Sequence, residues 1–204
     1  RDTYLNLVRN NSDNSNITIN NSNLKVKDEN YECQYLNALV ILGKNSTYNL
    51  NDSIIKASGF GISVNDGSDN IETGNKININ HSTVESTGGR DTQGEIFYGG
   101  VAIDMYVGAH QTLNITNNSI IKAASITDGS VRAISFLSSK GSVTNIKDST
   151  VYGGGYGIIA QSGSDNMSLN VENSSIVGSE IYGVELSTNT PVVKINNSII
   201  QTNA

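Results

Sequence analysis

The acidic turn Asn65-Asp66-Gly67-Ser68-Asp69-Asn70 is the stretch of this sequence that comes nearest to a metal site. Calcium takes several oxygen ligands from short acidic stretches of this kind. The spacing lacks the later bidentate Glu of an EF-hand, and the corresponding turn at Asp165 has only one Asp. Because Asp and Asn also cap turns, the sequence predicts turn capping here, with no metal and no other cofactor.

Other reactive residue types lack the partners that catalysis requires. His81 stands where other copies of a repeat have Asn or Asp, which favours a structural role, and His110 lies in a predicted corner. A β-helical polysaccharide lyase or glycosidase needs clustered carboxylates and a basic residue. Only four arginines are present, and no Asp pair recurs on adjacent coils. No Gly-x-Ser-x-Gly elbow and no phosphate-binding loop occurs, so a non-enzymatic function is favoured.

Three long insertions, Lys25 to Asn37, Ser86 to Gly100 and Ala123 to Arg132, follow one type of predicted strand. Insertions at one corner of a repeat protein stack along one face, and that face frequently binds the ligand. Tyr and Arg are favoured at binding sites because they combine apolar area with hydrogen bonding. The ligand-binding candidates in these insertions are Glu29, Tyr31, Tyr35, Arg90, Asp91, Gln93 and Tyr98.

A repeat organises the whole chain. Its pattern is an apolar residue, a polar residue, then Asn, Asp or His, then Ser, any residue and an aliphatic residue. Alternation before this pattern, as in Ile77-Asn78-Ile79, places the Asn side chains outward, where they can form ladders between coils. The copies are Ile19 to Leu24, Leu50 to Ile55, Ile79 to Val84, Ile115 to Ile121, Ile146 to Val151, Val171 to Ile176 and Ile195 to Ile200. We interpret the extra residue in the Ile115 copy as a β-bulge within a strand.

A second element, a small residue followed by an aliphatic one, lies between successive copies of the Ser pattern. We expect the small residue to let the backbone pass a tight corner. The pairs are Ala38-Leu39, Gly61-Ile62, Ala102-Ile103, Ala133-Ile134, Gly157-Ile158 and Gly183-Val184. Turns such as Gly163-Ser164-Asp165-Asn166 and Gly108-Ala109-His110-Gln111 follow at a similar offset, and we interpret them as equivalent corners of different coils.

The Ser pattern recurs with a minimum period of about 24 residues, and the period is longer where the connection after the Ser strand is longer. A repeat of this size, built from short strands with Gly and Asn at the corners, predicts a β-solenoid. The predicted fold is all-β, a right-handed parallel β-helix of about seven to eight coils. Residues 1–204 form one domain, which we expect to be a fragment of a longer helix because nothing in its sequence caps the ends.

Composition restricts the possible partners. The net charge is −6, and no Lys/Arg cluster occurs, which opposes binding to nucleic acid or to an anionic membrane. One cysteine gives no intramolecular disulfide, and no apolar run approaches the ~20 residues of a membrane span. An acidic, polar surface suits an extracellular protein.

The Asn/Ser/Thr-rich coils Leu169-Asn170-Val171-Glu172-Asn173-Ser174-Ser175-Ile176 and Ile195-Asn196-Asn197-Ser198-Ile199-Ile200 resemble those of bacterial autotransporter passenger domains, the family of pertactin and the self-associating surface adhesins. The resemblance covers essentially the whole chain. It implies a segment displayed at the bacterial cell surface, engaged in adhesion or in cell-cell aggregation and biofilm formation, and so connected with virulence.

The leading functional hypothesis is therefore a non-enzymatic adhesin segment. Its expected partners are a host glycan or extracellular-matrix protein and other passengers, through self-association. The alternatives are a β-helical polysaccharide-degrading enzyme, lyase or glycosidase, and a phage tailspike segment. Both alternatives predict a groove that gathers several carboxylates.

Overall fold

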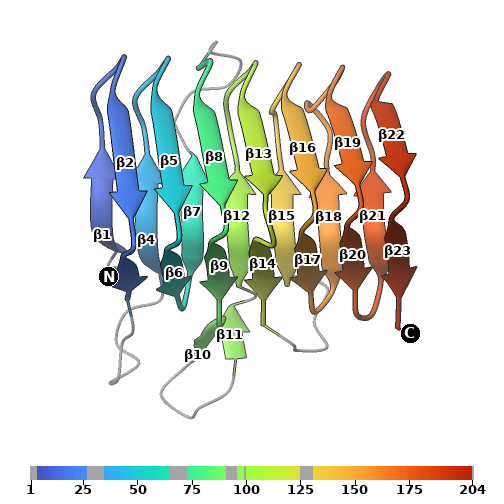
Figure 1. Cartoon of the computed structure of the whole chain (residues 1–204), viewed down its shortest axis with the longest axis horizontal. Coiled ribbons are helices and arrows are strands. Elements are labelled where there is room, and N and C mark those ends of the chain that lie inside the picture. Colours follow the sequence, from blue (N-terminus) through green and yellow to red (C-terminus); the bar gives the residue numbers. More distant parts are fainter. Residues whose placement is uncertain are drawn as a thin grey trace.

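A computed structural model describes residues 4–26, 35–64, 73–90, 96–98, 100–124 and 131–203. These residues form three seven-stranded parallel sheets, here called sheets A, B and C, and a small antiparallel pair of strands. Each coil contributes one strand to each sheet, in the order A, B, C. Figure 1 shows the coils stacked side by side along the long axis of the molecule. The fold is a parallel β-helix, as the repeat predicts.

Sheet A contains β1 (Tyr4–Asn10), β4 (Tyr35–Ile41), β7 (Phe60–Val64), β12 (Val101–Met105), β15 (Arg132–Phe136), β18 (Tyr156–Ala160) and β21 (Tyr182–Leu186). Sheet B contains β2 (Asn16–Asn20), β5 (Thr47–Asn51), β8 (Lys76–Asn80), β13 (Thr112–Thr116), β16 (Val143–Lys147), β19 (Ser168–Glu172) and β22 (Val192–Asn196). Sheet C contains β3 (Asn23–Lys25), β6 (Ile54–Ala57), β9 (Thr83–Ser86), β14 (Ile120–Ala123), β17 (Thr150–Gly153), β20 (Ser175–Gly178) and β23 (Ile199–Thr202). The antiparallel pair is β10 (Gly89–Arg90) with β11 (Ile96–Tyr98).

The Ser pattern forms the corner between sheets B and C. Its Asn, Asp or His residue has a positive φ, for example 49° at Asn173 and 46° at His81. The following Ser is buried in the inner coils, and its hydroxyl bonds to the backbone on two sides. Ser82 Oγ donates to the Asn80 carbonyl at 2.8 Å and accepts the Ser53 N–H at 3.0 Å. The same serine ladder recurs along the rod, so the corner is held by side chains as well as by strand pairing.

The extra residue of the Ile115 copy lies in this corner and not within a strand, contrary to the expected β-bulge. β13 ends at Thr116 and β14 begins at Ile120. Asn117 and Asn118 both have positive φ values, 56° and 58°. The strands on either side keep their register with the neighbouring coils, because a corner of two left-handed residues absorbs the insertion without shifting them.

The corner between sheets A and B also uses positive φ. His110 (58°), Gly141 (66°) and Asn166 (57°) stand at equivalent places two residues before their sheet B strands. The predicted equivalence of the turns at Gly108 and Gly163 is confirmed, since each lies in an A-to-B connection. The acidic turn containing Asp66 and Asp69 lies outside the described residues.

The small residues of the second element lie within sheet A strands, not at a corner as expected. In sheet A, Gly61, Ala102, Ala133, Gly157 and Gly183 are register neighbours on successive strands. A Cβ on Gly157 would approach the Gly183 carbonyl oxygen to 2.5 Å and a methyl of Ile176 in sheet C to 2.7 Å. The side chains of this column are small because sheets A and C lie close together there.

The core is apolar, and the outer face of sheet B is amide-rich. Side chains such as Ile77, Ile79, Leu113 and Ile115 are fully buried. The alternate residues point outward, and their amides form the predicted ladder. Asn78 donates to Asn49, Asn114 to Asn78, Asn145 to Asn114 and Asn170 to Asn145, each at 2.8 Å.

The three long insertions leave from one corner, as predicted. They join β3 to β4, β9 to β12 and β14 to β15, so each connects sheet C to sheet A. The short connections of other coils, such as Gly154-Gly155 between β17 and β18, occupy the same place.

The serine ladder predicts a defined stability loss. Ser82→Ala leaves the Ser53 N–H and the Asn80 carbonyl without their buried partner, and we expect the free energy of unfolding to fall by about 1–3 kcal/mol. Ser22→Ala is the matched control, because its partly exposed hydroxyl bonds only to the Asn20 carbonyl. Urea denaturation followed by circular dichroism measures both variants. Equal losses would show that the inter-coil bond contributes nothing.

Candidate functional site

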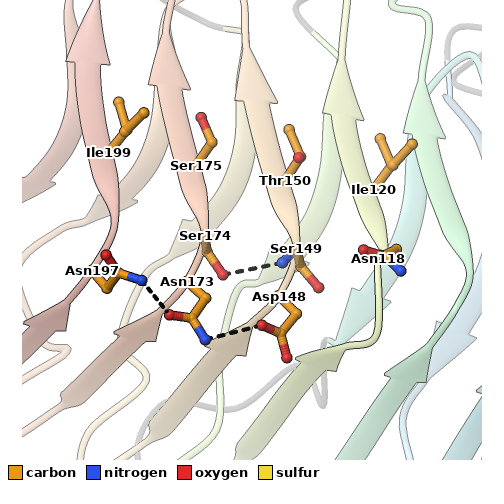
Figure 2. A pocket seen from close by; sticks show the side chains of 10 residues that line it. All are labelled: Asn118, Ile120, Asp148, Ser149, Thr150, Asn173, Ser174, Ser175, Asn197 and Ile199. Carbon is orange, nitrogen blue, oxygen red and sulfur yellow. Dashed lines mark hydrogen bonds between the residues drawn. The ribbon is translucent and has the colours of Figure 1, made fainter.

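A groove runs along the corner between sheets B and C over the last four coils. It encloses about 590 Å³, and residues of equivalent places on successive coils line it. Figure 2 shows the corner residues on one side and the first residues of the sheet C strands on the other. The lining residues are Asn118, Ile120, Asp148, Ser149, Thr150, Asn173, Ser174, Ser175, Asn197 and Ile199.

One wall of the groove is the column of left-handed corner residues. Their backbone conformation turns the side chains outward, where they bond from coil to coil. Asn197 Nδ2 donates to Asn173 Oδ1 at 2.8 Å, and Asn173 Nδ2 donates to Asp148 Oδ1 at 3.1 Å. Figure 2 shows both bonds running along the wall. The ladder therefore ends at Asp148, with Oδ2 making no hydrogen bond to a described residue.

The opposite wall has two hydroxyl side chains between two isoleucines. Ile120, Thr150, Ser175 and Ile199 are register partners on β14, β17, β20 and β23. Ile120 is 43% exposed and Ile199 59% exposed, which is unusual for isoleucine. The floor is the buried Ser149 and Ser174 of the serine ladder. A partner in this groove meets amide and hydroxyl groups, the Asp148 carboxylate and small apolar surfaces.

The inserted corner residue interrupts the ladder beside Asp148. Asn117 Nδ2 turns toward the preceding coil and donates to Asn80 Oδ1 at 2.5 Å. Asn118 occupies the groove position, and its side chain makes no hydrogen bond to a described residue. Figure 2 shows Asn118 one coil from Asp148, with no bond joining them. The groove thus has one place where a carboxylate oxygen and an amide are both unpaired among the described residues.

Of the residues that the structure describes, Asp148 is the only one with an ionisable side chain in the groove lining. Next to it, Lys147 Nζ lies 3.1 Å from Glu172 Oε1, and this hydrogen bond and charge raise the pKa of Lys147. Lys147 is therefore engaged with Glu172. Among the described lining residues, Asp148 carries the charge of the groove, and the other side chains are neutral.

The predicted ligand-binding residues fall in the insertions and not in this groove. Glu29, Tyr31, Asp91 and Gln93 lie outside the described residues. Tyr35 begins β4, Arg90 belongs to β10 and Tyr98 to β11, so the structure places their backbones only. Arg90 and Tyr98 lie in the same antiparallel pair of strands, whereas Tyr35 belongs to sheet A.

The two histidines occupy corners, as expected. His81 Nδ1 lies 2.6 Å from Asp52 Oδ1 on the preceding coil. His81 therefore takes part in the ladder of left-handed corner residues, in which the other coils have Asn or Asp. His110 has a φ of 58° at the A-to-B corner. Within the described ranges, no group of three or more His, Cys, Asp or Glu side chains could hold a metal ion.

Comparison with known proteins gives no relative: no family model, no curated protein and no solved structure matches this chain. In the described part of the chain, no helix is long and apolar enough to span a membrane. The candidate site therefore rests on its own geometry.

A second unusual group, Asp104, lies on β12 in sheet A between Ser63 and Ser135 in register. It is 7% exposed. Burial raises the pKa of Asp104 to about 7, although the Arg132 charge and the Ser135 hydroxyl oppose the rise. Along the same register column the next carboxylate is Glu185, three coils away at ~4.8 Å per coil. That spacing of roughly 14 Å exceeds the ~5–9.5 Å between paired carboxyls in glycosidases.

Asp104 predicts a pH-dependent stability. Between about pH 4 and pH 7 the folded state holds this proton and the unfolded state does not, so the free energy of unfolding falls as the pH rises through this window. The loss is at most about 4 kcal/mol and is complete above pH 7. Asp104→Asn removes the titrating proton, so the difference in stability between the wild type and this variant should change across the window. Urea denaturation at several pH values measures it; parallel curves for the two proteins would contradict the assignment.

Proposed function

We propose that this chain is a non-enzymatic adhesion module whose B–C groove binds an extended, hydroxyl-rich glycan. One observation carries the proposal: the groove presents amide and hydroxyl side chains on successive coils, with the exposed side chains of Ile120 and Ile199 at its two ends. Sugars present hydroxyls at their edges and C–H groups on their faces. Amide and hydroxyl side chains can form hydrogen bonds with the sugar hydroxyls, and isoleucine side chains can pack against the C–H faces.

The composition of the groove supports binding over catalysis. Glycoside hydrolysis usually needs two carboxyl groups flanking the bond, and among the described residues Asp148 is the only carboxylate in the lining. A lyase needs a base beside the substrate, and no Lys, Arg or His of the described part of the chain lines the groove. A chain bound there would be held and not cleaved.

The location proposed for such a module is the bacterial cell surface or the extracellular medium, as part of an autotransporter passenger. The acidic net charge of −6, the polar ladders and the β-helix are compatible with this setting. The partners proposed are a host glycan or extracellular-matrix protein, with no role for nucleic acid or for a membrane.

Glycan binding in the groove is tested by filling it. Thr150→Arg places a long charged side chain in the lining, and we expect binding to fall by at least about tenfold. Thr83→Arg is the matched control, because Thr83 occupies the same place on β9, outside the groove. Both variants and the wild type are compared on an array of polysaccharides and extracellular-matrix proteins. Absence of any wild-type binding, or equal binding by the two variants, would refute a groove-bound glycan.

A second candidate function is self-association, which the amide ladder on sheet B favours. Asn78 and Asn114 each donate one hydrogen bond and accept one along the rod, which leaves each amide with a further N–H and a further lone pair. Many weak contacts of this kind add up when two rods lie side by side. We expect the weight-average mass in sedimentation experiments to rise with concentration and to change little with salt. A mass that stays monomeric at high concentration would contradict self-association.

A further inference from the structure

The place where the corner ladder breaks differs from the rest of the groove. The other two amides of this wall, Asn173 and Asn197, each donate a hydrogen bond to the preceding coil. At the break, one carboxylate oxygen of Asp148 makes no hydrogen bond to any described residue. The side-chain amide of Asn118 also makes no hydrogen bond to a described residue. Adjacent coils are ~4.8 Å apart, so both groups lie within reach of one small polar unit.

We propose that Asp148 and Asn118 form a recognition point for a vicinal diol of an uncharged sugar. This inference rests on the proposed glycan-binding function of the groove and specifies which chemical group of the glycan Asp148 and Asn118 bind. An ionised carboxylate only accepts hydrogen bonds, so it pairs with hydroxyls that donate. The Asn118 amide both donates and accepts, so it pairs with the oxygen of the neighbouring hydroxyl.

Other ligand chemistries fit these groups less well. A calcium ion takes six to eight oxygen ligands, and only one carboxylate is available here. An anionic sugar would bring its charge against Asp148, while Lys147, the cation that precedes Asp148 in the chain, is engaged with Glu172 at 3.1 Å. Two adjacent hydroxyls match one acceptor-only carboxylate beside one amide, and an uncharged sugar brings no second negative charge next to Asp148.

The corner itself supplies a conservative test. Asn occupies the equivalent place at Asn21, Asn173 and Asn197 with φ between 46° and 49°, so Asp148→Asn fits the backbone. In the variant, Asn Oδ1 still accepts from Asn173, but the outward oxygen becomes an N–H donor. Asp52→Asn is the matched control: it removes the same charge from the same corner, at φ 50°, outside the groove.

The experiment measures binding of three polymers to the wild type, Asp148→Asn and Asp52→Asn by biolayer interferometry. The polymers are guar galactomannan, the same galactomannan after periodate cleavage and borohydride reduction, and polygalacturonate. Periodate cleaves the bond between carbons that carry adjacent hydroxyls, so the treated polymer loses its vicinal diols. We expect the wild type to bind intact galactomannan only, and Asp148→Asn to weaken that binding by about tenfold or more while Asp52→Asn does not.

Each other result overturns the inference in a distinguishable way. Equal binding by Asp148→Asn and the wild type would show that the diol is not read here, while the Thr150→Arg comparison would still decide whether the groove binds glycan. Undiminished binding after periodate treatment, tighter binding to polygalacturonate, or no binding to galactomannan would also overturn it. Asn118→Gly, which keeps the positive φ without the amide, gives a second reading: we expect a several-fold loss on galactomannan, and unchanged affinity would remove Asn118 from the site.

Discussion

The structure depends on one repeated arrangement, a left-handed residue followed by a buried serine at the B–C corner. A sharp corner leaves backbone N–H and C=O groups that cannot join the sheets, and buried groups of this kind must find partners. The serine satisfies two of them at once: Ser174 Oγ donates to the Glu172 carbonyl at 2.7 Å and accepts the Ser149 N–H at 3.1 Å. The left-handed backbone that precedes it costs roughly 1–2 kcal/mol for most residues, and Asn and Asp are the usual exceptions to Gly.

This constraint explains why the chain is rich in Asn. The corner requires positive φ, and at Asn173 the same residue also needs an outward side chain that bonds to the next coil. Glycine meets the first need and serves at the A–B corner, as at Gly141, but it cannot extend a ladder. Because Asn, Asp and His all satisfy the corner, as at Asn21, Asp52 and His81, the exposed chemistry of the column can change from coil to coil without altering the fold.

Much of the fold could be predicted from the sequence, because the repeat encodes it locally. Alternation in Ile77-Asn78-Ile79 predicts an inward and an outward face, and the ladder through Asn78 follows from stacking. The prediction that the extra residue at Asn117-Asn118 forms a β-bulge within a strand is wrong. A residue inserted between two strand patterns can lie in either strand or in the corner between them, and the sequence pattern alone does not distinguish these places. The small column through Gly157 was misplaced for a similar reason: the need for a small side chain comes from Ile176, which a different sheet contributes.

The candidate site was harder to predict than the fold, because it depends on differences between coils that the repeat hides. Thr83 and Thr150 occupy the same place in the pattern, yet only Thr150 lines the groove. Likewise, nothing in the sequence around Asp104 indicates its burial, which arises from the sheet around it.

The extra residue in the fourth coil has a consequence for recognition. An unbroken ladder would present the same engaged amide at every coil, and a polymer could slide along it with little change in free energy. By diverting Asn117 to Asn80, the insertion leaves Asn118 and Asp148 as a single distinct pair at one end of the groove. In the proposed glycan-binding function, one distinct contact would fix the position of a bound chain, while the repeated contacts along the remaining coils would add affinity.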